Sequence, residues 1–208
     1  MKDLRQNYTQ GELIENQISH NPFTQFQHWF TDALNSNILE PNVMVLSSMN
    51  GDKPDSRIVL LKDVRKEEFI FYTNYKSHKG QQLQNNPNCS LLFPWVNLER
   101  QVIVRGKASM ILPEESEEYF KSRPISSQIG AWASNQSSPI DSRADLDNQL
   151  KDVEKKFESE PLIKPPHWGG FAVIPYQIEF WQGRPNRLHD RILYTHENGA
   201  WIVSRLQP

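Results

Sequence analysis

The chain has 208 residues, of which 37% are hydrophobic and 23% are charged, a composition typical of one folded domain rather than a disordered tail. The 23 Lys and Arg residues against 25 Asp and Glu residues give a net charge of −2, and a general binder of nucleic acid or membrane surfaces would need a large basic excess. The start of the chain lacks the apolar segment of a signal peptide, and no stretch approaches the ~20 apolar residues of a membrane span. A cytoplasmic protein is therefore expected.

Residues 1–20 are polar and have no clear period, so we expect them to form an N-terminal arm. Asn21 and Pro22 then predict the start of a helix, with Asn as the N-cap and Pro at the first helical position. The apolar residues spaced for one face of this helix are Phe23, Phe26, Phe30 and Leu34, with Trp29 and Ala33 alongside.

Short β-rich runs separated by turn residues follow the helix, beginning with VMVLSSM, RIVLLK, EEFIFYT, CSLLFPW and RQVIVRGKASMI. Asn50-Gly51 after the first run is a strong hairpin signal. A helix is expected after Pro113 and another over about residues 143–157, before the chain returns to β structure with GFAVI, QIEFWQ, RILYT and AWIVSR. Closely spaced short strands favour an antiparallel barrel or sandwich over a parallel sheet. We therefore expect residues 21–208 to form one domain, mainly β with peripheral helices (α+β).

Several kinds of chemistry are poorly supported by the motifs. The chain has no glycine-rich phosphate loop and no G-x-S-x-G segment, and its six histidines include no H-E-x-x-H pair, so nothing predicts a metal site. Cys89 is the only cysteine and lies in an apolar run, which indicates a core residue rather than a nucleophile.

The most informative feature is a set of cations at predicted strand ends and turns, several of them close to hydroxyl, amide or aromatic residues. Taken singly, each is more consistent with a solvated surface position than with a binding site. Together, phosphate-binding cations beside planar rings are what a phosphorylated heteroaromatic ligand requires, although sequence spacing does not show that they converge. The cations are Arg57, Lys62, His78, Lys79, Arg123, Arg187 and Arg191.

In this order, the segments RIVLLK, FYTN, SLLFPW, ERQVIVRGKA, YFKSRP, SQIGAW, HWGGF, QIEFWQG and RLHDR resemble the pyridoxamine 5'-phosphate oxidase family over nearly the whole chain. The resemblance implies an FMN-binding split β-barrel that works as a homodimer, with the flavin at the subunit interface. It also implies oxidation of pyridoxamine or pyridoxine 5'-phosphate to pyridoxal 5'-phosphate, with O2 as acceptor and H2O2 as a product.

The resemblance further implies the residues of two sites. FMN would be held by Arg57, Ile58, Val59, Leu60, Leu61, Lys62, Tyr72, Thr73, His78, Lys79, Gln101, Gln136, Ser137, Trp181 and Arg191, some of them from the other subunit. The substrate would be held by Lys62, Tyr119, Arg123, Ser127, Arg187, Leu188 and His189, with Arg5 and Tyr8 in the arm that closes over the site. Arg187 would orient the substrate and stabilise developing charge, whereas His189 would either move a proton or pack. The family commonly has an arginine where this chain has His78.

Two alternatives stay open. The chain could be another split-barrel flavoprotein that reduces its substrate with a nicotinamide donor, although YFKSRP and SQIGAW, which match the substrate-phosphate pocket, count against this. It could also bind FMN or pyridoxal phosphate without turnover, since the binding residues would be the same.

Overall fold

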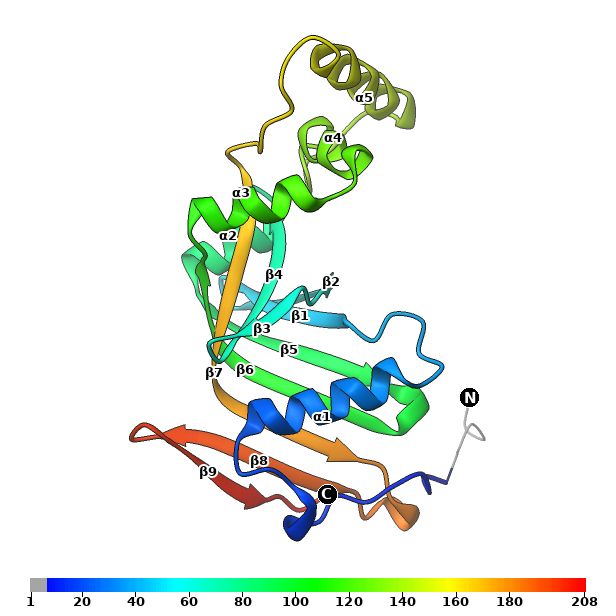
Figure 1. The fold of residues 1–208 in the computed structure, drawn as a ribbon, viewed down its shortest axis with the longest axis vertical. Helices are drawn as coiled ribbons and strands as arrows, with labels where there is room; N and C mark the ends of the chain where they lie inside the picture. Colours follow the sequence, from blue (N-terminus) through cyan, green and yellow to red (C-terminus); the bar gives the residue numbers. More distant parts are fainter. Residues whose placement is uncertain (1–6) are drawn as a thin grey trace.

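The computed structural model describes residues 7–208, and in this part of the chain nine strands form one antiparallel sheet (Figure 1). The order is β2-β1-β5-β6-β7-β4-β3, with β8 and β9 extending the sheet beside β7. The expected α+β architecture, mainly β with peripheral helices, is confirmed. The strands are β1 Val43–Asn50, β2 Lys53–Leu60, β3 Asp63–Arg65, β4 Glu68–Asn74, β5 Asn88–Trp95, β6 Arg100–Met110, β7 Trp168–Gln182, β8 Asp190–Glu197 and β9 Ala200–Arg205. The helices are α1 Pro22–Leu34, α2 His78–Asn85, α3 Pro113–Ser122, α4 Ile125–Ala133 and α5 Arg143–Phe157, and short 3-10 turns cover Glu15–Gln17, Val96–Leu98 and Pro185–Arg187.

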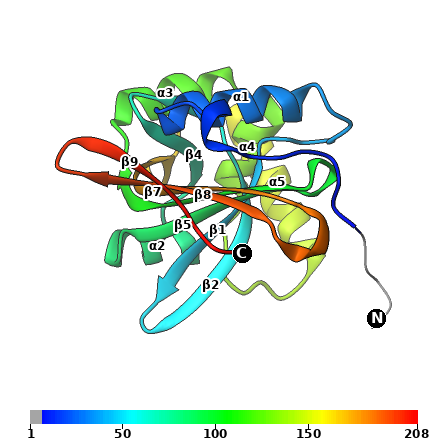
Figure 2. The same ribbon diagram turned by 90° about the horizontal axis from the view of Figure 1, so that it is seen from below.

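Helix α1 begins as the sequence predicts and lies across one face of the sheet (Figure 2). The Asn21 side chain accepts hydrogen bonds from the backbone N–H groups of the first turn, at 2.8 and 3.1 Å. The Phe26 ring packs 5.0 Å from the rings of both Phe69 and Phe93. Leu34, in contrast, is 57% exposed, because the buried face of the helix runs through Phe26, Trp29 and Ala33 instead.

Strand β7 corrects one expectation, because GFAVI and QIEFWQ belong to a single strand of 15 residues rather than to two strands. Pro175 between them lies where the register of β6 and β7 shifts, next to Arg105 and Gly106. A bulge at this point lets the strand continue through a residue that has no N–H group to donate. Gly106 permits the close approach, since a Cβ there would lie 2.5 Å from the carbonyl oxygen of Ile174.

The same strand connects the two ends of the molecule. Along one edge β7 pairs with β6, and along the other it pairs with β4 over residues 168–173 and with β8 over residues 177–182. Helices α3, α4 and α5 lie around the start of β7, and the β8–β9 hairpin lies at its end (Figure 1). Side chains and loops at the two ends of β7 are therefore far apart within one chain.

The described part of the N-terminal arm packs against this second end. Leu13 is buried in the main core, and its backbone N–H donates to the Asp190 carboxylate at 3.0 Å. Arg205 forms a two-pronged ion pair with Glu15, at 2.6 and 3.0 Å, and also donates to the Leu13 carbonyl. None of the helices formed by residues 7–208 has the length and apolar character needed to cross a membrane.

Candidate active site

A cavity of about 770 Å³ opens between the sheet and the helices at the start of β7. Its walls come from β2, β4, the first turn of α2, the end of α3, the inner face of α4 and the first residue of β7. The lining residues are Ile58, Val59, Leu60, Lys62, Tyr72, Thr73, Asn74, Lys79, Tyr119, Ser122, Arg123, Pro124, Ser127, Gly130, Ala131, Ser134, Gln136 and Trp168. The structure thus brings residues predicted for the flavin and residues predicted for the substrate phosphate into one cavity.

Three aromatic rings form a stack in the wall of this cavity. The Tyr72 ring lies 3.9 Å from the Tyr119 ring, and 5.3 Å from the Trp168 ring, with interplanar angles of 16° and 11°. Burial raises the pKa of Tyr72 to about 12, so its hydroxyl is a neutral donor at ordinary pH. Since Tyr72 was assigned to the flavin and Tyr119 to the substrate, the two predicted groups are in direct contact.

Arg123 has the clearest signature of an anion site. Its guanidinium carbon lies 4.6 Å from the centre of the Trp168 ring, a cation–π contact, and its Nη1 atom is buried without a hydrogen-bond partner in the described part of the chain. Burial lowers the pKa of this guanidinium from its ordinary value. A buried donor without a partner is costly, especially on a charged group. An anion entering the cavity would supply the hydrogen-bond acceptor that Arg123 Nη1 lacks.

Lys79 is the second cation that faces the cavity. It is half-buried at the second position of α2, two residues after the N-cap Ser77. Burial, assisted by the nearby Arg57 charge, lowers the Lys79 pKa from its ordinary value. The neighbouring His78 is exposed and does not line the cavity, so its predicted contact with a ligand phosphate stays a prediction.

Other predicted flavin residues surround the cavity without lining it. Arg57 turns toward Asp55 and the amide oxygen of Gln82, which accepts its hydrogen bond at 2.9 Å. Leu61 is buried in the hydrophobic core. Ser137 is exposed next to Gln136 and has a φ of 74°.

A separate row of predicted flavin residues crosses three strands at the other end of β7. Gln101 pairs with Trp181, and Trp181 pairs with Arg191, so the three side chains share one face of the sheet. Glu179 on β7 fixes this row. Its side chain is 3% exposed and accepts from Arg191 at 2.7 and 2.8 Å and from Arg105 at 3.1 Å.

The predicted substrate loop lies beside this row. The His189 ring is 4.6 Å from the Trp181 ring and 5.6 Å from the ring of Tyr8 in the arm. The backbone N–H of Arg184 donates to His189 Nδ1 at 3.1 Å, which assigns the proton of a neutral imidazole to Nε2. Arg187 is exposed with a φ of 62°, a conformation that costs energy outside glycine and is often found at functional sites. Leu188 is also exposed, at 68%, and Arg5 lies outside the described residues.

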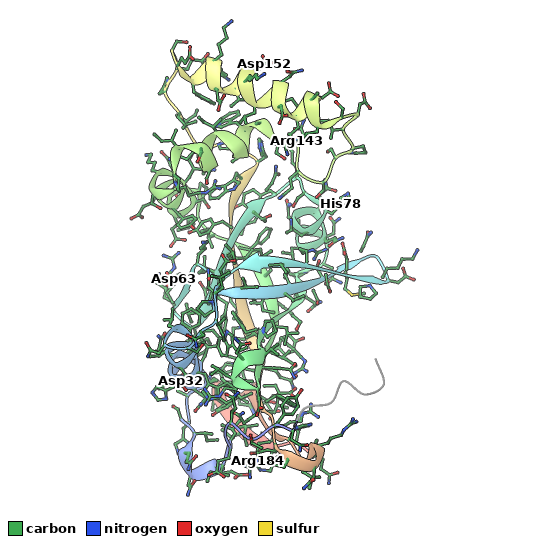
Figure 3. The ribbon with its side chains drawn as sticks, turned by 90° about the vertical axis from the view of Figure 1, so that its right-hand side faces the viewer. Asp32, Asp63, His78, Arg143, Asp152 and Arg184 are labelled. Carbon is green, nitrogen blue, oxygen red and sulfur yellow. The ribbon has the colours of Figure 1, made fainter. Side chains whose placement is uncertain are left out.

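The cavity residues therefore lie apart, within one chain, from a second group. This second group consists of the row Gln101, Trp181 and Arg191 and the adjacent substrate loop, residues 187–189. Trp168 in the cavity and Trp181 in the second group lie near opposite ends of β7, whose 15 residues cover about 45 Å along the strand at about 3.3 Å per residue. In Figure 3, His78 is in the upper half of the molecule and Arg184, next to the second group, is at the lower end.

Three residues that contribute to this geometry had no role predicted from the sequence. Trp168 lies under Arg123, Glu179 holds Arg191, and Gly130 lines the cavity from α4. Trp168 and Gly130 were within quoted motifs, HWGGF and SQIGAW. Glu179 alternates with Trp181 along β7, and this period of two was the available signal that they share a face.

The fold and the cavity define a split-barrel protein with cations beside stacked aromatic rings, and these cations have no ion-pair partner among residues 7–208. Residues 30–156 match the family described as pyridoxamine 5'-phosphate oxidase, and residues 168–208 match the pyridoxine 5'-phosphate oxidase C-terminal dimerisation region. The chain belongs to the pyridoxamine 5'-phosphate oxidase family, as the motifs predicted.

Curated relatives agree with this assignment, and two solved structures share the fold. The chain is 50% identical to a pyridoxine/pyridoxamine 5'-phosphate oxidase of Paraburkholderia phymatum, covering 100% of this chain and 99% of the relative. It is also 50% identical to the protein of that name from Gloeothece citriformis, covering 99% and 97%. The solved structure of PhzG from Burkholderia lata 383, with tetrahydrophenazine-1-carboxylic acid, superimposes with a TM-score of 0.89 at 24% identity, covering 96% of this chain and 100% of that one. An FMN-binding protein from Nostoc punctiforme gives a TM-score of 0.71 at 14% identity, covering 92% and 100%. These two likenesses confirm the expected split-barrel fold.

Proposed function

We propose that this protein is an FMN-dependent oxidase that converts pyridoxamine or pyridoxine 5'-phosphate into pyridoxal 5'-phosphate. The alcohol and O2 yield the aldehyde and H2O2, while the amine, O2 and water yield the aldehyde, ammonia and H2O2. The observation that supports this most directly is Arg123, a half-buried cation without an anionic partner among the described residues, over the aromatic wall of a cavity. The 50% identity to proteins named for this activity supports it independently.

The residues of the cavity suit FMN. Lys79 and Lys62 offer positive charge to one phosphate, and the Thr73 hydroxyl adds a neutral donor. Ile58, Val59 and Leu60 provide a largely apolar wall for a planar ring. FMN, when bound, supplies the acceptor for two electrons, and the chain contributes binding, orientation and exclusion of water.

The substrate phosphate is assigned to the end of the cavity formed by α3 and α4. Arg123 lies just after α3, Tyr119 is on α3, and Ser127 is on α4, so a guanidinium and two hydroxyl groups face the same space. A phosphate there would accept a charge-assisted hydrogen bond from Arg123, whose Nη1 has no partner elsewhere in residues 7–208. An unphosphorylated vitamer would leave that donor buried and unpaired, and this is the physical basis for selecting the phosphorylated form.

A complete site requires two copies of the chain under this proposal. The residues assigned above the substrate ring, Arg187 and His189, are at the far end of β7 from the cavity, and no ligand of this size reaches both ends. In a homodimer, the second group of one chain would cover the cavity of the other. This agrees with the match of residues 168–208 to a dimerisation region. Arg187 would then orient the substrate, and His189 would offer its Nε2 proton to it.

The test is a peroxide assay on purified protein supplied with FMN and either pyridoxamine or pyridoxine 5'-phosphate. We expect a yellow dimer that releases FMN on denaturation and produces one H2O2 per aldehyde. Oxidation of a reduced nicotinamide without peroxide would indicate the reductase alternative. FMN binding without any turnover would indicate a binding protein, and release of FAD would contradict the assigned cofactor.

A further inference from the structure

Gly130 in α4 has no requirement in the fold that explains it. It lies inside the helix Ile125–Ala133, does not have a positive φ, and a Cβ placed on it would meet no atom within 4 Å. Gly80 and Gly106 differ, because a Cβ at either would lie 2.5 Å from a backbone carbonyl oxygen.

A glycine inside a helix is therefore a disadvantage to the isolated chain. Relative to alanine it lowers the equilibrium constant for folding by about fivefold, because the unfolded chain loses more freedom on becoming helical. Neither a turn nor a close packing contact compensates this loss at Gly130 in the described part of the chain. What Gly130 does provide is bare backbone on the wall of the cavity.

The position of Gly130 indicates which ligand uses that space. Residues three apart on a helix lie on one face, so Gly130 is next to Ser127, one turn along α4. Ser127 and Arg123 are the groups assigned to the substrate phosphate, and both line the cavity with Gly130. A phosphate held there would lie within about one helical turn, ~5 Å, of Gly130. Lys79, in contrast, reaches the cavity from α2.

We propose that Gly130 is a specificity-determining residue, and that the phosphorylated substrate packs directly against the backbone of α4 where the side chain is missing. This inference rests on the proposed function. A side chain at residue 130 would leave the fold intact and occupy the volume of the ligand. Stability and substrate binding should consequently respond in opposite directions to the same substitution.

The experiment uses the full-length holoenzyme with Gly130→Ala and Gly130→Leu, and with Ser126→Ala as a control. Ser126 is also on α4 but is exposed and does not line the cavity. We expect Gly130→Ala to raise Tm by about 2–4 °C and to raise KM for pyridoxine 5'-phosphate by about tenfold, with a larger rise in Gly130→Leu. The Kd for FMN should stay within about twofold of wild type in every variant, and Ser126→Ala should leave KM unchanged.

Several results would overturn the inference. One is an unchanged KM in both Gly130 variants, and another is weaker FMN binding with an unchanged KM, which would assign the space to the cofactor. Dissociation of the dimer, measured by light scattering, would assign it to a partner subunit, and failure of both variants to fold would contradict the open space itself. If the wild-type protein produces no peroxide, the proposed function fails by itself. The inference is then decided by calorimetric titration with pyridoxal 5'-phosphate, which must bind wild type more tightly than Gly130→Leu.

Discussion

Replacing Arg123 with leucine should separate phosphate recognition from folding and from flavin binding. In the free protein the guanidinium lies over the Trp168 ring and one of its nitrogens has no acceptor among residues 7–208. A substrate phosphate would supply that acceptor, and one charge-assisted hydrogen bond contributes about 1.5–3 kcal/mol. At about 1.4 kcal/mol per factor of ten, kcat/KM for the phosphorylated substrate should fall by about 10- to 150-fold for each bond lost.

The stability of the ligand-free protein should change little. Leucine removes the cost of burying one unpaired guanidinium nitrogen but also removes the cation–π contact with Trp168, which contributes about 0.5–2 kcal/mol. These effects oppose each other, so we expect Tm to shift by no more than about 4 °C. Arg143→Leu is the matched control, since Arg143 is an exposed arginine on α5 paired with Asp147.

The assay compares peroxide production from pyridoxine 5'-phosphate and from unphosphorylated pyridoxine, together with FMN titration by flavin fluorescence. The Arg123→Leu variant should lose most of its preference for the phosphorylated compound while retaining its FMN affinity, and Arg143→Leu should resemble wild type. An unchanged preference for the phosphorylated substrate, or a loss of FMN without a change in KM, would refute the assignment of Arg123 to the substrate phosphate.

Two further predictions concern the cofactor and the substrate loop. Lys79→Met should raise the Kd for FMN by about tenfold or more. His78→Ala should raise it less, because Lys79 lines the cavity and His78 does not. A larger effect of His78→Ala than of Lys79→Met would contradict this geometry. Phosphate favours the ammonium form of Lys79, whose pKa burial lowers, so FMN affinity should decrease as pH rises through that lowered pKa. Lys79→Arg should remove this decrease, and parallel pH profiles of the two proteins would argue against it. In steady-state kinetics, Arg187→Ala should lower kcat and raise KM together, while His189→Ala should have a milder effect if its imidazole only packs; wild-type turnover in Arg187→Ala would exclude the assigned role.

Local signals in the sequence predicted much of the fold. Asn50-Gly51 lies between two paired strands, with Gly51 at a φ of 64°, and the expected helix over about residues 143–157 coincides with α5. Cys89 is a core residue as expected, and burial raises the pKa of its thiol to about 12. The continuity of β7 was not predictable in this way, because Pro175 normally interrupts a strand and the bulge that accommodates it depends on Gly106 of another strand.

The candidate site, like the fold, could be predicted from the sequence only in part. Motifs predicted the residue types, and the structure gathers Tyr72, Lys79 and Arg123 into one cavity from distant parts of the chain. Sequence spacing could not reveal that Arg123 lacks a partner, because burial and hydrogen bonding depend on the packing of α3 against β7. Nor could it reveal that Gln101 pairs with Trp181, since strand register is a long-range property.

The length of β7 implies that two inactive variants of the proposed homodimer can complement each other. Each chain carries the cavity at one end of β7 and the Arg187 loop at the other. In the proposed homodimer, the cavity and the loop of one chain would therefore belong to two different composite sites. If an inactive variant of Arg123 is mixed and refolded with an inactive variant of Arg187, about half of the dimers contain one chain of each kind. In such a dimer one composite site has both defects and the other has none. The mixture should therefore recover about a quarter of wild-type activity, although neither parent variant is active.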